Sequence, residues 1–405
     1  MSYLIVQKFR SSKNIGLELH MTEKRQIAIS LPSTGDAEWE AVREPLNTGW
    51  LTQGPKVAAF EKAFAKRHKV KHAIATTSCT TALHLMLVAS GIGIGDEVIV
   101  PAFTWVATAN AVLYCGATPV FVDVNPTTNN ISLEDLSKRI TSKTKAVIAV
   151  HLFGLCVDIP SICSILPSRV LLFEDCACAA GASFDSIPAG GLCDAGAFSF
   201  HPRKSITTGE GGMVTTNNDA LAEKIYMLRN HGASISEEQR LQGSHPYLLP
   251  DFNLLGFNYR MTDIQGAIGL VQLSKLDKFI AERELWAKFY RENLADIPWL
   301  RMPYFPDHDT TTHAWQAFVT YVDPDKAPMS RNEIMDRLQA QGIATRPGTH
   351  AVHMLGYYRD RFGLRPNDYV GARDCNNNTM AIPMHNLMTS EDYEYVVKSL
   401  KDLGS

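Results

Sequence analysis

The 405-residue sequence has no run of about 18 consecutive apolar residues, the length that a membrane-spanning helix needs. Residues 1–20 also lack the compact apolar stretch and small-residue cleavage site of a secretory signal. Charge of one sign is not in excess either, because 39 Lys and Arg residues stand against 42 Asp and Glu residues, a formal net charge of −3. We therefore expect a cytoplasmic protein with no membrane partner and no nucleic-acid partner, since nucleic-acid binding needs a net basic surface.

Cysteine is too sparse for a disulfide framework, and no paired C-x-x-C spacing indicates a zinc site. Most of the eight cysteines are expected to be small buried hydrophobes. They are Cys79, Cys115, Cys156, Cys163, Cys176, Cys178, Cys193 and Cys375. The composition is otherwise that of an ordinary globular chain, with 45% apolar and 20% charged residues, and the length predicts roughly two or three packed units.

Short apolar runs alternate with segments of helical spacing from residue 72 onward. This alternation is typical of a mainly parallel sheet covered by helices on both faces. We therefore predict an α/β fold whose large domain, residues 29–274, contains a mainly parallel sheet of about seven strands. The predicted strands are residues 72–75, 97–100, 118–122, 146–151, 170–173, 195–200 and 212–215.

The pattern changes after a long amphipathic helix predicted over residues 262–293. A strand at 317–321, a helix at 331–341 and a final helix capped by Thr389 with Asp392 indicate a smaller α+β domain over residues 275–405. Residues 1–28 are expected to form an N-terminal extension. Met21 is a candidate native start within it, and the residues before Met21 are a candidate vector remnant.

Ligands of open α/β sheets bind at the carboxyl ends of parallel strands, so the residues that follow each predicted strand are the site candidates. After residues 72–75, the hydroxyl-rich run 76–81 leads into a helix, and a helix N-terminus favours a phosphate. An ordinary helix cap by Ser78 or Thr80 is the alternative. Trp105 follows the next strand and can stack on a planar ligand, unless it is a core tryptophan.

An acid and a lysine follow two later strands. Asp175 comes after the apolar run 170–173 and needs a cationic or hydrogen-bonding partner there, unless it is a structural cap. Lys204 comes after the run 195–200 and before three glycines, and poor solvation beside His201 and Arg203 favours a nucleophilic amine that suits a Schiff base. A surface lysine is the alternative. A phosphate nest, an aromatic plate, an acid and a lysine are together the parts that hold pyridoxal phosphate.

Three long motifs carry a resemblance to a known family. They are GDEVIVPAFTWVATANAV, EDCACAAGA and LGFNYRMTDIQGAIGL, and they accompany the lysine-bearing stretch from Ser199 to Met213. With these motifs the chain, over about residues 29 to 400, resembles the sugar aminotransferases of the DegT/DnrJ/EryC1/StrS family, which adopt the aspartate aminotransferase-like fold type I. The resemblance implies a pyridoxal phosphate enzyme that passes through the pyridoxamine phosphate form.

The resemblance also implies roles for individual residues. Lys204 matches the Schiff-base lysine that moves the proton, and Asp175 matches the partner of the pyridine nitrogen. Trp105 matches the aromatic that stacks on the ring, and Ser199 matches a serine that reaches the phosphate. Asn258 matches an asparagine that the other subunit contributes to the phosphate, so the active site would need a homodimer.

Two positions depart from the family pattern, and both are cysteines. Cys79, with Thr80, stands where a Gly-Thr pair binds the phosphate, so the nest must accept a side chain. Cys178 stands where Gln, Glu or His is usual beside the cofactor ring, and a thiol is a weaker hydrogen-bond partner. Dehydratases of the family carry His in place of the lysine, so Lys204 favours transamination.

The loop 345–353 supplies the candidate contacts to the sugar. Arg346 suits a carboxylate or phosphate, and His350 and His353 can donate to sugar oxygens, although His353 could equally cap the loop. His350 and His353 with Asp360 or Asp374 as a metal hydrolase site are disfavoured, because no H-E-x-x-H helix surrounds them, and we expect no metal. A nicotinamide site at Gly91, Gly93 and Gly95 is disfavoured because these glycines precede a strand.

The sequence thus predicts transfer of an amino group from glutamate or glutamine to a keto or aldehyde sugar. The acceptor is expected to be nucleotide-linked or a sugar acid, used for lipopolysaccharide or another cell-surface polysaccharide. A cyclitol aminotransferase of the scyllo-inosose type is the alternative within the fold. A non-catalytic sensor that binds pyridoxal phosphate is the alternative from another class.

Overall fold

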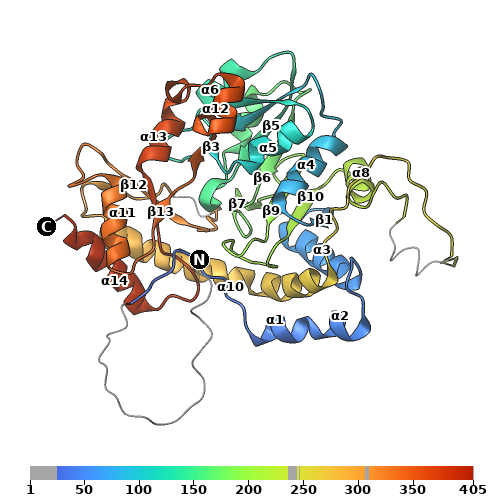
Figure 1. Ribbon diagram of the computed structural model, residues 1–405, viewed down its shortest axis with the longest axis horizontal. Coiled ribbons are helices and arrows are strands. Elements are labelled where there is room, and N and C mark those ends of the chain that lie inside the picture. The colour runs from blue at the N-terminus through green and yellow to red at the C-terminus, as the bar shows by residue number, and fades with distance from the viewer. Residues whose placement is uncertain (1–24, 236–243, 246, 306–309, 405) are drawn as a thin grey trace, which may run out of the picture.

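The computed structural model describes residues 25–235, 244–245, 247–305 and 310–404. The expected N-terminal extension, with Met21, lies almost entirely outside these residues. Within them, the chain forms a seven-stranded sheet in the order β1-β10-β9-β6-β5-β2-β4 (Figure 1). The strands are β1 (His72–Thr76), β2 (Glu97–Pro101), β4 (Thr118–Val122), β5 (Thr144–Val150), β6 (Leu171–Asp175), β9 (Ala195–Ser199) and β10 (Gly212–Thr216).

These strands confirm the predicted α/β fold and its seven apolar runs. β9, β6, β5, β2 and β4 are mutually parallel, whereas β10 runs antiparallel to both β1 and β9. β10 follows the lysine-bearing connection of residues 200–211, which contains no helix, whereas a parallel neighbour usually needs a helical crossover. β1 therefore points the same way as β6 and β9, and the carboxyl ends of all three lie along one edge of the sheet.

Helices cover both faces of this sheet, as the alternating apolar residues along each strand require. In β2, Val98 and Val100 pack in one core cluster, whereas Ile99 packs in another on the opposite face. The first face is covered by α4 (Cys79–Ala89), α5 (Ala107–Tyr114) and α8 (Asp219–Arg229). The second face is covered by α3 (Pro55–His68), α6 (Leu133–Arg139), α7 (Ile159–Ile165) and the first part of α10 (Asp263–Leu294).

The long helix α10 packs closely against α3 because small residues and one acid line their contact. A Cβ added to Gly266 would lie 2.7 Å from the backbone nitrogen of Val57, so only glycine permits this approach. The carboxylate of Asp263 accepts hydrogen bonds from the backbone N–H groups at the start of α3, at 2.9–3.0 Å. The first turn of α10 thereby caps the N-terminus of α3, and the two helices pack together beneath the sheet.

A second sheet follows α10, in the order β11-β12-β15-β13, and all its strand pairs are antiparallel. Its strands are β11 (Leu300–Arg301), β12 (Phe318–Val322), β13 (Arg346–Pro347) and β15 (Thr379–Ile382). Its helices are α11 (Arg331–Ala340), α12 (Gly356–Phe362), α13 (Val370–Asn378) and α14 (Ser390–Asp402). Thr389 and Asp392 form the predicted capping box at the start of α14, which ends before Gly404.

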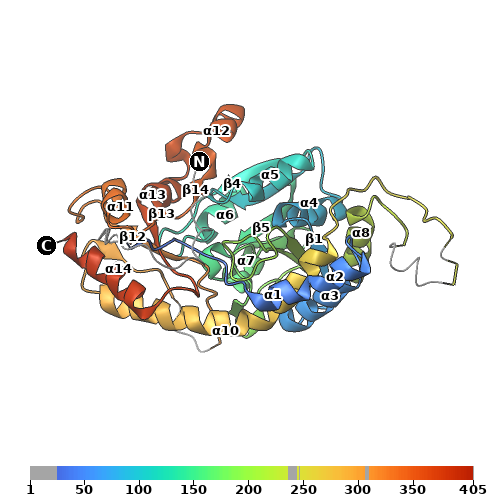
Figure 2. The same ribbon diagram turned by 60° about the horizontal axis from the view of Figure 1, so that its bottom comes forward.

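The two sheets share α10, which Figures 1 and 2 show running beneath both of them. Ile280 in this helix packs in the core under the large sheet, and Ala287, two turns later, packs in the core of the small sheet. Ile27 belongs to the second core and bridges to Ile343, so the start of the described chain joins the small unit. The division at residues 274 and 275 falls inside this continuous helix and stays a prediction.

The remaining elements are short. They are α1 (Asp36–Ala41), α2 (Arg43–Thr48), β3 (Phe103–Thr104), β7 (Ser183–Phe184), β8 (Ile187–Pro188) and β14 (His350–Ala351), with 3₁₀ turns at Leu152–Gly154, Val352–Met354 and Pro366–Asp368. β14 of the small unit pairs with β3 of the large unit, which brings His350 opposite Thr104. None of the helices in the described residues combines the length and apolarity of a membrane span.

Candidate active site

Asp175 ends β6 in a buried position, with 5% of its surface exposed. Its Oδ2 accepts a hydrogen bond from the Thr108 hydroxyl at 2.8 Å, and its Oδ1 accepts one from the Ala177 N–H at 3.1 Å. Burial raises the pKa of Asp175, and these two hydrogen bonds and the charge of Lys204 only partly oppose it. The site therefore holds an acid whose charge the protein alone does not fully compensate.

Lys204 lies in the turn between β9 and β10. Its Nζ donates to the Cys178 sulfur at 3.3 Å, and its backbone N–H donates to the His201 carbonyl at 2.9 Å. The Phe200 carbonyl closes the turn by accepting from the Thr207 hydroxyl and the Thr208 N–H. The predicted lysine is thus half-buried within the site and is not a free surface amine.

The hydroxyl-rich segment forms the N-terminus of α4, directly beside this turn. Ser78 caps the helix by accepting from the Thr81 N–H, while the Thr81 hydroxyl accepts from the Ser78 N–H. A Cβ on Gly212, the first residue of β10, would lie 2.4 Å from the Ser78 carbonyl group, so the strand after the lysine turn approaches the helix end as closely as glycine allows. The half-buried Thr80 follows in the first turn of this helix.

Cys79 fits this nest because its side chain turns into the protein. The residue is 9% exposed, and its thiol donates to the Ala197 carbonyl of β9 at 3.5 Å. Burial raises the pKa of Cys79, with the charge of Asp175 acting in the same sense and that of Lys204 opposing it. Its backbone N–H still belongs to the first turn of α4, where helix geometry leaves it without an intrahelical acceptor. The thiol therefore points toward β9, and the free backbone N–H groups of this helix end, predicted to bind a phosphate, are kept.

The other predicted cofactor contacts differ in exposure. Trp105 is 61% exposed and follows β3, and its ring centroid lies 5.6 Å from that of His350. Ser199 is half-buried at the end of β9, where its hydroxyl accepts from the His201 N–H at 3.4 Å. Asn258 is exposed, although the next residue, Tyr259, accepts a hydrogen bond from the Thr77 N–H just before α4.

Arg346 reaches this group of residues from β13. Burial lowers the pKa of Arg346, and the charge of Arg203 acts in the same sense, whereas that of Cys178 opposes it. Its Nε is buried and has no hydrogen-bond partner among the described residues. A guanidinium so placed can bind an anionic ligand, which would compensate its burial.

The two loop histidines are in different environments. His350 is exposed beside Trp105, whereas His353 is fully buried, with its Nε2 3.2 Å from the Pro366 carbonyl and its ring edge-on to Tyr369. A side chain in that position cannot reach a sugar, so the loop-cap alternative describes His353. The pair does not form a metal site, because one imidazole faces solvent and the other lies in the core.

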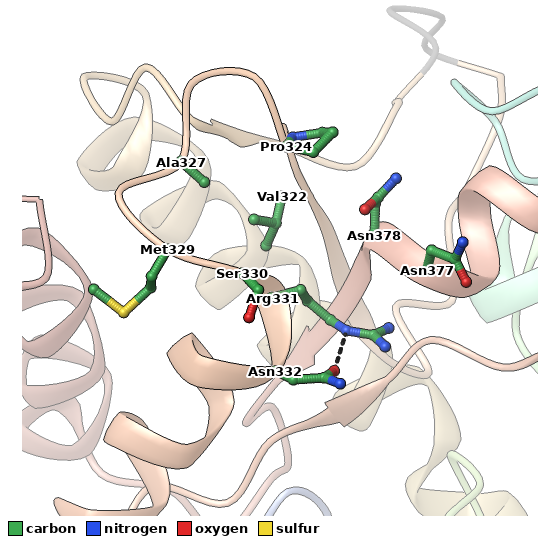
Figure 3. Close-up of a pocket in the computed structure, with 9 residues that line it drawn as sticks. All are labelled: Val322, Pro324, Ala327, Met329, Ser330, Arg331, Asn332, Asn377 and Asn378. Atoms are coloured by element: carbon green, nitrogen blue, oxygen red, sulfur yellow. Dashed lines mark hydrogen bonds between the residues drawn. The ribbon is translucent and has the colours of Figure 1, made fainter.

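A hollow elsewhere on the small unit contains none of the predicted site residues. It lies between β12, the start of α11 and the end of α13 (Figure 3), and Arg331 is its cationic group. Arg331 Nη1 donates to the carbonyls of Asn376 and Thr379, so the cation closes the C-terminus of α13. Arg331 thus has a structural role, and the other residues that line this hollow carry no charged side chain.

Comparison with known proteins gives the same assignment. Residues 32–401 match the DegT/DnrJ/EryC1/StrS aminotransferase family. The chain belongs to this family. It is 38% identical to the spore coat polysaccharide biosynthesis protein SpsC of Bacillus subtilis, over 95% of this chain and 99% of that one, and 39% identical to the GDP-perosamine synthase of Caulobacter vibrioides, over 94% and 99%.

Solved structures confirm the aminotransferase fold of type I. The putative sugar aminotransferase Spr1654 of Streptococcus pneumoniae, in its PLP form, superposes with a TM-score of 0.86 at 27% identity, over 94% of this chain and 99% of that one. Its PMP form superposes equally well, with a TM-score of 0.85. The resemblance identified from the motifs is therefore confirmed for family, fold and enzyme class.

Sequence reasoning missed two residues that support this site, Thr108 and Gln316. Thr108 bonds to Asp175 from the first turn of α5, and its place three residues after Trp105 is the signal that could have revealed it. Gln316 donates to the Arg203 carbonyl at 2.8 Å and so holds the lysine turn from the small unit. No sequence pattern marks this contact, because its partners are far apart in the chain.

The raised pKa of Asp175 predicts that Asp175→Asn stabilises the cofactor-free protein. The folded form binds the carboxyl proton more tightly than the unfolded chain, so stability is lost as pH rises from the ordinary value of 3.8 through the raised value. At neutral pH the amide avoids this loss and keeps its acceptor for Ala177, while the Thr108 hydroxyl can donate instead to the Trp105 carbonyl. We expect a gain of about 1 kcal/mol by thermal unfolding. A lower Tm than the wild type at neutral pH would contradict the raised pKa.

Proposed function

We propose that this protein is a pyridoxal phosphate-dependent aminotransferase that moves an amino group from glutamate or glutamine onto a keto or aldehyde sugar. The observation that carries the proposal is the convergence of Asp175 and Lys204 from the adjacent parallel strands β6 and β9, beside the N-terminus of α4. Family membership and the PLP and PMP forms of a structural relative support it. The relatives named for a spore coat polysaccharide and for GDP-perosamine support a nucleotide-linked sugar used for a cell-surface polysaccharide.

The residues of the site fit the cofactor in three respects. Asp175 is a buried acid that lacks full compensation, as a partner for a protonated pyridine nitrogen should be. The first turn of α4, with Cys79 and Thr80, offers backbone N–H groups and a hydroxyl to the phosphate, and Ser199 adds a second hydroxyl. Trp105 presents an exposed ring on the side of the site where β14 crosses.

Each protein group then has a defined task. When bound, pyridoxal phosphate supplies a ring that accepts the electrons left behind when the substrate carbon loses its proton. Asp175 keeps the ring nitrogen protonated, and Lys204 Nζ binds the cofactor and afterwards carries the proton to and from the substrate carbon. Cys178 receives a hydrogen bond from that same Nζ, so its thiol holds the amine on one side of the site.

The small unit supplies the substrate contacts in this proposal. Arg346 is a half-buried cation whose Nε has no partner in the described part of the chain, so it suits a carboxylate or phosphate of the substrate. His350 is exposed beside Trp105 and suits a neutral sugar oxygen. His353 is left out because it is buried.

We include a homodimer with shared active sites. The described chain between α8 and α10 projects from the body in Figure 1 and exposes large apolar side chains, among them Tyr247 at 75%, Leu249 at 85% and Leu255 at 93%. Exposed apolar groups of this density favour burial against another protein surface. Asn258 follows directly and is exposed, as a residue offered to a partner's phosphate must be.

The proposal also includes a division into domains of residues 29–274 and 275–405 and a cytoplasmic location. A cyclitol acceptor differs from a nucleotide-linked one in having no phosphate for Arg346 to bind. A sensor differs in lacking turnover, which the first test below decides.

Lys204→Ala is expected to remove amino transfer, because the variant loses the amine that binds the cofactor and moves the proton in this proposal. The rate should fall at least about 10²–10⁴-fold, measured as conversion of a panel of keto sugars with glutamate. Pyridoxal phosphate should also no longer give a visible absorption band characteristic of the wild type. Lys401→Ala, which removes an exposed lysine paired with Asp296, is the control and should behave as the wild type. Normal turnover in Lys204→Ala would refute the assignment.

Shared active sites predict complementation between two inactive variants. Asn258→Ala should weaken phosphate binding in the partner's site, and Lys204→Ala inactivates its own site. Mixed dimers of the two contain one intact site each, so refolding an equal mixture should recover about a quarter of wild-type activity. Recovery no greater than the summed activities of the separate variants would show that Asn258 does not act across subunits.

His350→Ala is expected to affect only the half-reaction with the sugar. Loss of one hydrogen bond should lower kcat/KM for the acceptor about fivefold to tenfold, while the half-reaction with the amino donor changes by less than about twofold. His72→Ala, which changes a histidine paired with Asp219 at the far edge of the sheet, is the control. Equal loss in both half-reactions would place His350 at the shared cofactor site instead.

A further inference from the structure

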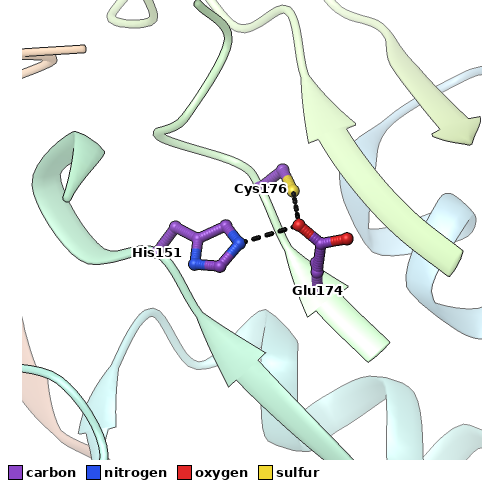
Figure 4. A group of neighbouring side chains, drawn as sticks. All are labelled: His151, Glu174 and Cys176. Carbon is purple, nitrogen blue, oxygen red and sulfur yellow. Dashed lines mark hydrogen bonds and ion pairs between the residues drawn. The ribbon is translucent and has the colours of Figure 1, made fainter. Parts of the chain in front are cut away.

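A buried polar cluster lies on the face of β6 opposite Asp175. Glu174, the preceding residue, is fully buried and points away from the site, because neighbouring side chains of a strand alternate between faces. Its Oε2 accepts from His151 Nε2 at 2.9 Å and from the Cys176 thiol at 3.7 Å, as Figure 4 shows. His151 follows the end of β5. Glu174 and Cys176 flank Asp175, the acid of the proposed site, at the end of β6.

The cluster has the residue types of a metal site but not the free lone pairs. His151 Nδ1 accepts from the Val157 N–H at 3.1 Å, so the hydrogen of this imidazole is on Nε2 and points at Glu174. Both oxygens of Glu174 are also occupied by backbone donors, the N–H groups of Gly190 at 2.7 Å, Leu192 at 2.9 Å and Cys193 at 3.0 Å. A cation between His151 and Glu174 would have to displace the hydrogen bond from Nε2 and compete with the Gly190 N–H at Oε2.

The backbone that Glu174 binds is the turn leading into β9, the strand that ends at Ser199 and is followed by the turn with Lys204. This turn can reach the carboxylate because two glycines meet there, a Cβ on Gly196 falling 2.6 Å from the Cα of Gly190. On the other side, the backbone N–H of His151 donates to the Asp175 carbonyl at 3.0 Å. One carboxylate and one imidazole thus connect the strand that ends in the acid to the strand that leads to the lysine.

We propose that Glu174, held by His151, is a positioning residue that fixes Asp175 and Lys204 relative to each other. The inference rests on the proposed function, because it assigns a purpose to a distance between two groups of that site. Glu174 touches neither substrate nor cofactor and acts only through the strands it joins.

Glu174→Gln tests this with little change of shape. The amide –NH₂ would face either the two N–H donors at Oε1 or the Nε2–H and Gly190 N–H at Oε2. His151 cannot relieve the conflict by changing tautomer, because Nδ1–H would then meet the Val157 N–H. The turn before β9 must shift, and a shift of this kind is expected to weaken pyridoxal phosphate binding about tenfold.

The measurements are the Kd for pyridoxal phosphate of the cofactor-free protein, the pH midpoint of the visible band of the loaded protein, and the Tm. Glu174→Gln should move the midpoint in the same direction as Asp175→Asn, because the first variant disturbs the placement of the Asp175 carboxylate and the second removes that carboxylate. Asp123→Asn is the matched control. Asp123 also follows a sheet strand and accepts three backbone N–H groups, from Val124, Gly371 and Ala372, but lies beyond the edge strand β4.

The control should lower the Tm and leave the Kd within about twofold of the wild type. If Glu174→Gln also lowers only the Tm, with the Kd within about twofold of the wild type and an unchanged midpoint, the proposal is overturned and Glu174 has only a structural role. If Glu174→Gln does not fold, His151→Leu and His151→Gln decide. His151→Leu should weaken cofactor binding. His151→Gln, which can present an N–H to Glu174, should restore it. Equal Kd values for the two variants and the wild type would overturn the proposal. A wild type that gives no visible band with pyridoxal phosphate would refute the proposed function itself.

Discussion

The burial of two neighbouring carboxylates at the end of β6 is the constraint on which the rest of the molecule depends. Glu174 and Asp175 point to opposite faces of the sheet, and each needs donors that only distant parts of the chain can bring. Glu174 receives a full set from the backbone and from His151. Asp175 receives two hydrogen bonds and the field of one lysine, and its pKa stays raised. Glu174 therefore needs no ligand to satisfy its charge, whereas Asp175 is poised for a cationic ligand.

Several contacts from the small unit serve this same edge of the sheet. β14 pairs with β3 and sets His350 beside Trp105, and Gln316 donates to the backbone of the lysine turn. The buried Arg283 of α10 donates to the Trp315 carbonyl and so fixes the segment that carries Gln316. Because α10 runs through both cores, a displacement of the small unit would be transmitted directly to the turn that carries Lys204.

The sequence predicts the elements far better than their contacts. Seven apolar runs locate the strands, and the Thr389 capping box locates the last helix, because periodicity and capping are local properties. The order in which Asp175 and Lys204 follow strands also predicts that they meet, since the carboxyl ends of parallel strands share one edge. The burial of His353 is not predictable in this way, because it depends on Pro366 and Tyr369, which fold back over the loop.

The role of Glu174 shows the same limit more sharply. In the sequence it is one half of an acidic pair, and no local rule distinguishes it from Asp175. What separates them is the turn at Gly190, 16 residues later, whose backbone reaches only one of the two faces. Close approach between glycines is a property of packing, and periodicity carries no information about it.

The two cysteines that depart from the family pattern follow from the same electrostatics. A thiol at position 79 is neutral when buried, so it can lie near the uncompensated Asp175 without adding a second charge. A carboxylate at position 178, one of the usual choices in the family, would add a negative charge beside both Lys204 and Arg346. The thiol of Cys178 instead accepts the hydrogen bond of the lysine amine, and Arg346 Nε is left without a hydrogen-bond partner among the described residues. Under the proposed function, an anionic substrate would compensate Arg346, just as the protonated ring nitrogen of the cofactor would compensate Asp175, and both groups together would complete the site.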